Sequence, residues 1–430
     1  MSAPHVIPSP SEKKVIPAWQ IIAALVILTA APLWQLHTIS KNIPSSKADM
    51  VAVWKAAQAA FHGQNPYLNA TTLDIQRFYY GHALTAAEPY NPMAYAYPMH
   101  TVLLFAPIAP LPWSIVRPLF LVLLPVLTAL SVPLWIKVAG LRFTRNQTLV
   151  ATALCLCSWP AMWAVHQIQP TLIVAFLAAA GCRLLQRGNA AAAGVLFALA
   201  TIKPQLVGIL LLWIFLWAAL RRLWSFFLSF GATLAVLLAA SFKMLPGWVA
   251  SWRHASAEHA IYRHLQLDLQ AVFGHLIGLF IAIALIAIAL PLLWKGRRCA
   301  PDSPAFGAMC ALTLSLTLCI LPSDSAMTYN YVLVFPACLI IVASAPFQRS
   351  YSALARSVAL GLIGWSYFTV LIAALALALG GLPGIWELLP FETMLLPATV
   401  LLGLIVPLLE SNFSRRSVVT LAEQLASQPF

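Results

Sequence analysis

Two charged residues attract attention because charge is rare in this sequence and both types can do chemistry: Asp49 and Lys203. A carboxylate such as Asp49 can accept a proton from a hydroxyl group as a general base. An ammonium group such as that of Lys203, beside a proline at the end of a short apolar stretch, can stabilise an anion. Each also has a structural interpretation. Asp is a favoured helix N-cap, and a lysine at the end of an apolar segment can extend its ammonium group to the membrane interface.

The composition decides which class of protein must position these residues. The chain has 430 residues, of which 61% are apolar and 9% are charged, and its mean hydropathy is +0.85. Soluble domains are roughly 45–50% apolar and about 25% charged, so a soluble, disordered or disulfide-stapled protein is excluded. The net charge of +13 does not indicate nucleic-acid binding, because the basic residues form small clusters between apolar segments.

Long apolar stretches recur from residue 17 to residue 410, which predicts an all-α polytopic membrane protein forming one integral membrane domain over residues 1–430. The stretch 99–112 is too short to span and contains three prolines, so we expect it to re-enter or to pack at the interface. About twelve transmembrane helices are predicted, at 17–37, 113–137, 148–165, 170–186, 190–203, 205–220, 224–245, 272–294, 305–321, 330–346, 353–379 and 393–410.

The charge distribution predicts the orientation of these helices. With both termini in the cytoplasm, most of the 25 lysines and arginines fall in short cytoplasmic loops, as the positive-inside rule requires. Most of the 12 acidic residues then fall on the other side, together with the two largest loops, 38–98 and 246–271. We therefore expect the function to reside on the extracytoplasmic face.

The first large loop combines a helix with an aromatic segment. An amphipathic helix is predicted to begin after Asp49 and to close at Gly63. The second part of the loop, residues 88–100, is rich in proline and tyrosine and contains Glu88, Tyr90 and Tyr97. These tyrosines can line a site, or they can belong to an aromatic belt at the membrane interface.

The second large loop holds further cationic candidates for an anion site, namely Arg253, His254 and His259. The arrangement His254-x3-Glu258-His259 fits neither the His-Glu-x-x-His spacing of zinc sites nor its inverse, so no metal site is predicted. The seven cysteines have no metal-ligand spacing, and most of them lie in apolar stretches as small buried residues.

An ordered set of short motifs resembles glycosyltransferase family 87 over roughly residues 45–225. The set comprises Asp49-x4-Trp54-x-Ala56-Ala57, Gly63-Gln64-Asn65-Pro66-Tyr67, Tyr97-Pro98, His166-Gln167-Ile168-Gln169 and Lys203-Pro204. His166 stands where the family usually has Gly, and Tyr329 or Tyr331 stands near the position where it often carries His.

This resemblance implies a fold of the GT-C type and a donor that is a sugar, mannose-like or a pentose, linked to polyprenyl phosphate. It implies transfer with inversion to a hydroxyl of a lipid-linked or cell-envelope glycan, at the extracytoplasmic face of a bacterial inner membrane, without cofactor or metal. The expected partners are the donor, the glycolipid or glycan acceptor and membrane lipids. By the same resemblance, Asp49 is the general base. Glu88 is the fallback, because it is the only other first-loop acid next to the aromatic segment. Donor-phosphate binding is expected at Lys203, Arg253, His254 and His259, and substrate binding at Glu88, Tyr90, Tyr97, His166, Gln167, Gln169, Tyr329 and Tyr331.

Two other functions stay open at this point. A twelve-span transporter or lipid flippase usually carries ionisable residues inside its spans and has repeated halves, and the sequence lacks clear signs of either. A ligase that moves a whole lipid-linked glycan would share the predicted topology, and nothing in the sequence separates it from a transferase of single sugars.

Overall fold

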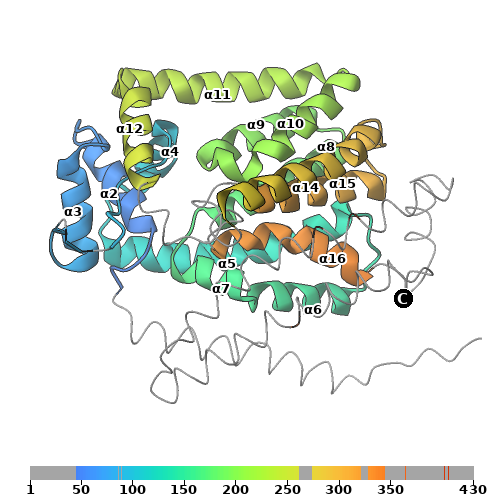
Figure 1. Ribbon diagram of the computed structural model, residues 1–430, viewed down its shortest axis with the longest axis horizontal. Coiled ribbons are helices and arrows are strands. Elements are labelled where there is room, and N and C mark those ends of the chain that lie inside the picture. The colour runs from blue at the N-terminus through green and yellow to red at the C-terminus, as the bar shows by residue number, and fades with distance from the viewer. Residues whose placement is uncertain are drawn as a thin grey trace, which may run out of the picture.

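The computed structural model of the protein describes residues 45–85, 87, 88, 90–260, 274–320 and 328–343, and the single positions 364, 401 and 405. Every regular element within these ranges is a helix (Figure 1). A helix satisfies its own backbone hydrogen bonds without water, which is the condition that a bilayer imposes. The predicted all-α class is confirmed for this part of the chain.

Three helices are long and apolar enough to cross a bilayer: α5 (Trp113–Val138), α11 (Trp224–Met244) and α14 (His275–Gly296). A fourth crossing results if α6 (Arg145–Leu156) and α7 (Trp159–His166), which meet at a bend of 57°, count as one span. The described ranges thus hold three or four spans by length, and the predicted number of twelve is not confirmed. Apart from the single positions 364, 401 and 405, the predicted spans 17–37, 353–379 and 393–410 lie outside these ranges.

The other predicted spans between residues 170 and 343 form shorter helices. At 1.5 Å per residue, a helix of 17 residues extends about 26 Å, which is less than a hydrocarbon core of about 30 Å. Figure 1 shows several of these helices in the middle of the molecule, between α11 and α5. They are α8 (Thr171–Gln186), α9 (Ala190–Leu199) with η2 (Ala200–Ile202), α10 (Pro204–Leu220), α15 (Pro304–Ile320), and η5 (Thr328–Val334) with α16 (Phe335–Ala343).

The two large loops come together at one end of the molecule, on the left in Figure 1. The first loop supplies α2 (Met50–Phe61) and α3 (Asn69–Tyr80), followed by α4 (Met99–Phe105) and η1 (Ala106–Ile108). The second supplies α12 (Trp248–Ala260). The Trp252 indole N–H of α12 donates to the carbonyl of Ala96 at 2.8 Å, which joins the two loops.

Helix α2 is more deeply buried than the predicted amphipathic helix. Nine of its 12 residues are buried, because α3, α4 and η1 all pack against it. The Trp54 indole N–H donates to the Leu111 carbonyl at 3.1 Å, and its ring packs at a tilt against that of Trp113, with ring centroids 5.4 Å apart. The stretch 99–112 contributes the short pieces α4 and η1 to this packing, in agreement with its predicted failure to span.

Several helix ends that carry lysine and arginine residues contact one another, away from the two large loops. The Gln186 amide at the end of α8 donates to the Val138 carbonyl at the end of α5, at 3.0 Å. Beyond α14, the Cys299 carbonyl accepts from the Trp217 indole at 3.0 Å and from the Arg221 guanidinium. The end of α8 thus contacts the end of α5, and the end of α10 contacts the turn after α14, while the side of the membrane on which these basic turns lie stays a prediction.

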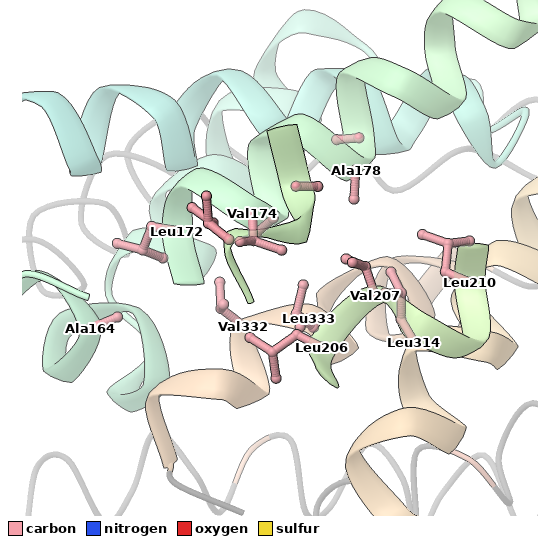
Figure 2. Close-up of a cluster of buried hydrophobic side chains, with 14 of the residues drawn as sticks. Ala164, Leu172, Val174, Ala178, Leu206, Val207, Leu210, Leu314, Val332 and Leu333 are labelled. Atoms are coloured by element: carbon pink, nitrogen blue, oxygen red, sulfur yellow. The ribbon is translucent and has the colours of Figure 1, made fainter. Parts of the chain in front are cut away.

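A dry core lies between these helices, formed by side chains from α7, α8, α10, α15 and η5 (Figure 2). Removing one such leucine side chain typically costs about 2–5 kcal/mol. The same elements carry or adjoin most of the polar residues described next, so these residues lie beside the buried core. The core residues labelled in Figure 2 are Ala164, Leu172, Val174, Ala178, Leu206, Val207, Leu210, Leu314, Val332 and Leu333.

Candidate active site

Asp49 immediately precedes α2, but its side chain makes no capping hydrogen bond to the helix. Instead, a carboxylate oxygen accepts a hydrogen bond from the Gln169 amide, and Tyr329 donates a second one. The Asp49 backbone N–H donates to the Gln167 carbonyl at 3.0 Å. The interpretation of Asp49 as a simple helix cap is therefore wrong: the carboxylate points to residues from distant parts of the sequence.

The ionisation of Asp49 suits a general base. Burial raises the pKa of its carboxyl above the ordinary value, while the nearby Lys203 charge and the hydrogen bonds from Gln169 and Tyr329 oppose this rise. A carboxylate with a raised pKa binds a proton more strongly than an ordinary one, as a general base must. The residue as a whole is partly exposed, although its carboxyl group is buried.

The turn after α7 presents Gln169 to Asp49. Gln169 N–H bonds to the Ala164 carbonyl at 2.8 Å and Ile168 N–H to the Val165 carbonyl at 3.1 Å, a pattern that closes a helix through a left-handed residue. That residue is Ile168, with φ of 51° and no exposed surface. A branched side chain in this conformation costs roughly 1–3 kcal/mol, so the buried contacts of Ile168 must hold the turn in place.

Lys203 lies in the turn between η2 and α10, and it is only 5% exposed. Its ammonium group donates to the Gln169 side-chain oxygen at 2.7 Å and to the Thr171 hydroxyl at 2.9 Å. It also lies 5.1 Å from the ring centroid of Tyr329 and 5.6 Å from that of Tyr97. The alternative in which Lys203 extends to the membrane interface is therefore wrong.

One amide joins the cation to the carboxylate, because Gln169 donates to Asp49 and accepts from Lys203. A buried ammonium group is costly to desolvate, and an opposite charge nearby offsets much of that cost. The two charged residues singled out from their chemistry thus form one cluster, although more than 150 residues separate them in the sequence.

Two residues that the sequence did not point to complete this chain of hydrogen bonds. The Thr171 hydroxyl, which accepts from Lys203, donates to the Asn330 side-chain oxygen at 2.7 Å. Thr171 is fully buried and Asn330 is 2% exposed. A signal for Asn330 was present, since it lies between Tyr329 and Tyr331, but an amide beside two tyrosines has no distinctive spacing.

Side chains of α4 contact the residues just before Lys203. The Nε2 atom of His100 is 3.1 Å from the Thr201 carbonyl, and the Thr101 hydroxyl donates to the Ile202 carbonyl at 3.5 Å. These contacts connect the first loop to the residues just before Lys203. The position of the ammonium group therefore depends on the packing of α4 as well as on its own turn.

The tyrosines of the first loop pack inward around this cluster. The Tyr95 and Tyr97 rings stack at 5.8 Å, and the Tyr67 hydroxyl donates to the Tyr97 carbonyl at 2.9 Å. Burial and the Asp49 charge raise the pKa of Tyr97, and they also raise the pKa of Tyr80 to about 12. These contacts favour a site over a belt in the membrane interface.

Tyr90 is more peripheral. It is 51% exposed, and its ring stacks on that of Tyr80 at 5.7 Å. Tyr90 thus lies on the outer side of the tyrosine group that surrounds Asp49, where a substrate could contact it but the carboxylate does not.

Glu88 lies apart from this cluster in its described contacts. Its oxygens accept from the Thr85 N–H and hydroxyl at 2.8 and 2.9 Å and contact His82 at 2.8 Å. The hydrogen bonds from Thr85 and His82 lower the pKa of Glu88 to about 2. A carboxylate that gives up its proton so readily is a weak base, so Asp49 is the better candidate of the two.

The remaining predicted residues have different surroundings. His166 is buried at the end of α7 beside Trp163, and the Gln167 side-chain oxygen is buried without a hydrogen-bond partner. Tyr331 is buried in η5. Arg253 and His254 are exposed on α12. The side chains of Glu258 and His259 lie outside the described residues, so the possible metal set of the second loop remains untested.

The comparison with known families gives one match: residues 95–322, just over half of the chain, match glycosyltransferase family 87. The match starts after Asp49 and continues well past residue 225, so its range differs from the range of 45–225 expected from the motifs. It includes Gln169, Thr171 and Lys203. Comparison with curated proteins and with solved structures gives no significant match.

Proposed function

The chain belongs to glycosyltransferase family 87, and from this premise we propose that it transfers a sugar from a polyprenyl-phosphate donor to a hydroxyl group of a lipid-linked or cell-envelope glycan. The sugar is mannose-like or a pentose. The transfer is a single displacement that inverts the anomeric carbon. The reaction takes place at the extracytoplasmic face of the inner membrane.

One observation carries this proposal: the Asp49 carboxylate and the Lys203 ammonium group share the Gln169 amide. A sugar linked to lipid phosphate already has a good leaving group. The enzyme then has two tasks, to remove a proton from the acceptor hydroxyl and to stabilise the charge of the departing phosphate. A base and a cation in one cluster are suited to these two tasks.

In the proposed reaction, Asp49 takes the proton of the acceptor hydroxyl while that oxygen attacks the anomeric carbon. The bond between this carbon and the phosphate oxygen breaks, and the electron pair leaves with the phosphate. The Lys203 ammonium group has three N–H bonds, and two of them are used by Gln169 and Thr171. The third is proposed to bind the leaving phosphate.

Other residues are proposed to hold the substrates around this centre. Tyr97 and Tyr329, whose rings lie near the Lys203 ammonium group, are proposed to contact the sugar. The unpaired Gln167 oxygen is suited to accept from a sugar hydroxyl. Tyr90, Glu88, His166 and Tyr331 remain proposed substrate contacts from the sequence, and Arg253, His254 and His259 remain proposed donor-phosphate contacts at the α12 side of the site.

The choice of donor tests the proposed function directly. The purified full-length protein in lipid nanodiscs is incubated with a membrane-extracted acceptor and either a polyprenyl-phosphate sugar or the matching nucleotide sugar. We expect labelled product from the lipid-linked donor alone. Transfer from the nucleotide sugar without a lipid intermediate would contradict the proposed donor class. Movement of the intact lipid-linked sugar across the bilayer without transfer would favour the transporter instead.

The proposed sidedness gives a second prediction. A cysteine at Ala70, which is exposed on α3, should react with a membrane-impermeant thiol reagent in intact cells. A cysteine at Asn146, exposed in the first turn of α6 among the basic residues, should react only after the membrane is permeabilised. The unsubstituted protein, which has seven cysteines of its own, provides the background. The reverse labelling pattern would place the Asp49 cluster in the cytoplasm.

A further inference from the structure

Gln169 uses both ends of its side chain within the cluster. It is 1% exposed, its NH2 group donates to the Asp49 carboxylate, and its oxygen accepts from the Lys203 ammonium group at 2.7 Å. The resemblance to the family implied that Gln169 binds substrate. Each end of the amide can make one more hydrogen bond, but so little of the side chain is exposed that a sugar has scant access to it. The Gln167 oxygen, by contrast, is buried without a partner.

Only one orientation of the Gln169 amide is compatible with its two neighbours. An ionised carboxylate can only accept hydrogen bonds, and an ammonium group can only donate them. Turning the amide over would bring its oxygen against the Asp49 oxygens and its NH2 group against the Lys203 ammonium group. The amide therefore fixes the relative position of base and cation, and the ionised form of each partner in turn fixes the amide.

The backbone holds Gln169 in this position from both sides. On one side, the left-handed Ile168 closes α7. On the other, Pro170 leads into α8, whose first residue, Thr171, is the second acceptor for Lys203. Gln169 and Thr171, which are separated only by Pro170, are thus two acceptors on one short and sterically constrained segment.

We propose that Gln169 is a positioning residue of this site, which holds the Asp49 carboxylate and the Lys203 ammonium group in one geometry and keeps Asp49 ionised for its role as base. This inference rests on the proposed function for the role of Asp49. The physical reason is that a hydrogen bond donated to a carboxylate stabilises its charged form.

Several other groups face Asp49 and must be considered in any titration. They are Lys203, Tyr329, Tyr97 from the segment before α4, and Tyr79 and Tyr80 from α3. Burial and the Asp49 charge raise the pKa of Tyr79, Tyr80 and Tyr97 above the usual phenol value of about 10, so these three stay neutral near pH 7.

Two charged or titratable groups on neighbouring helices have partners of their own. His100 on α4 contacts Thr201, and Lys55 on α2 is paired with Asp74 on α3 at 3.0 Å. Among the described residues that contact Asp49 electrostatically, Gln169 and Lys203 are therefore the two whose replacement should change its ionisation most.

The test uses Gln169→Glu, which keeps the shape and the acceptor for Lys203. It removes the donor to Asp49 and places a second carboxylate beside it. The protonated Asp49 carboxyl is followed by infrared spectroscopy against pH and is identified by its absence in Asp49→Asn. The midpoint of Asp49 should rise by about one pH unit or more. The acidic limb of kcat/KM should move to higher pH by the same amount, because the ionised carboxylate is the active form.

The matched control is Gln186→Glu, at the far end of α8, the helix that begins two residues after Gln169. A helix of 16 residues is about 24 Å long, so this equal change of charge lies far from Asp49. Gln186 bonds to Arg183 and to the Val138 carbonyl, outside the site. The midpoint of Asp49 and the pH profile of this control should equal those of the unsubstituted protein.

A second variant keeps the proposal testable if Gln169→Glu does not fold. Gln169→Met has a similar size and adds no charge, and it should also raise the midpoint, because the donor to Asp49 is lost. An unchanged midpoint in a folded Gln169 variant would overturn the positioning role. Failure of the proposed function is a separate result: Asp49→Asn would then retain transfer, while the infrared midpoint would still report on Gln169.

Discussion

Replacing Asp49 by Asn is expected to reduce sugar transfer by at least ~10²-fold, the usual contribution of a general base. The substitution keeps the size of the side chain and an oxygen that can accept from Gln169, but an amide cannot take up the acceptor proton. Capping is not affected, because the Asp49 side chain does not cap α2. The measurement is the initial rate of transfer from a polyprenyl-phosphate sugar, with expression and donor binding followed in parallel.

Two other acids of the first loop provide controls. Asp74→Asn removes an exposed carboxylate that is paired with Lys55, and Glu88→Gln removes the fallback base. Asp74→Asn should retain most of the activity, because the described contacts of Asp74 do not include Asp49 or Lys203. Glu88→Gln should lose less activity than Asp49→Asn, because Glu88 is proposed to contact substrate and not to take the proton. A loss in Glu88→Gln with normal transfer by Asp49→Asn would assign the base to Glu88. Normal transfer by both Asp49→Asn and Glu88→Gln would show that neither of these first-loop acids is the general base.

Replacing Lys203 by Met should produce the second large effect, a fall in transfer of about 10²-fold or more, the magnitude seen when one stabilising donor is removed from an active site. The apolar stem of the side chain is retained, but the proposed phosphate contact is lost. The Asp49 carboxylate also loses its nearby positive charge, so the pKa of Asp49 should rise further. Transfer should be measured over a range of donor concentration and of pH.

The pH dependence separates the two proposed roles of Lys203. Raising the pH restores ionised Asp49 and should recover only part of the lost rate, because the phosphate contact remains absent. Complete recovery at high pH would mean that Lys203 acts only on Asp49. Lys55→Met is the matched control. Like Lys203, Lys55 has its ammonium group near an aromatic ring, 5.1 Å from the Trp54 ring centroid. Its ion pair, however, is with the exposed Asp74. Its replacement should leave transfer nearly unchanged.

Much of the secondary structure could be predicted from hydropathy. The predicted spans 113–137, 224–245 and 205–220 agree within a few residues with α5, α11 and α10, because long apolar runs are bounded by polar or proline residues. The burial of α2 could not be predicted in this way. Its sequence permits an amphipathic helix, and the depth of burial depends on how α3 and α4 pack on it.

The sequence predicted which residues belong to the candidate site better than it predicted how they contact one another. Rarity of charge was enough to select Asp49 and Lys203, because an ionised side chain in an apolar chain must have a reason to be retained. The family motifs added Gln169, but with the role of a substrate contact. Thr171 and Asn330 were missed, since a threonine at the start of a helix and an amide between tyrosines are common in every membrane protein.

The sequence by itself determined that this is a helical membrane protein, which residues carry its rare charges, and which family its motifs resemble. Only the tertiary structure decided that Asp49 bonds to Gln169 instead of capping its own helix, and that Lys203 turns inward. The physical reason is that apolar helices of similar composition can pack in many ways with similar burial. The contacts between distant segments depend on particular turns, such as the left-handed Ile168, whose geometry no pattern of hydropathy encodes.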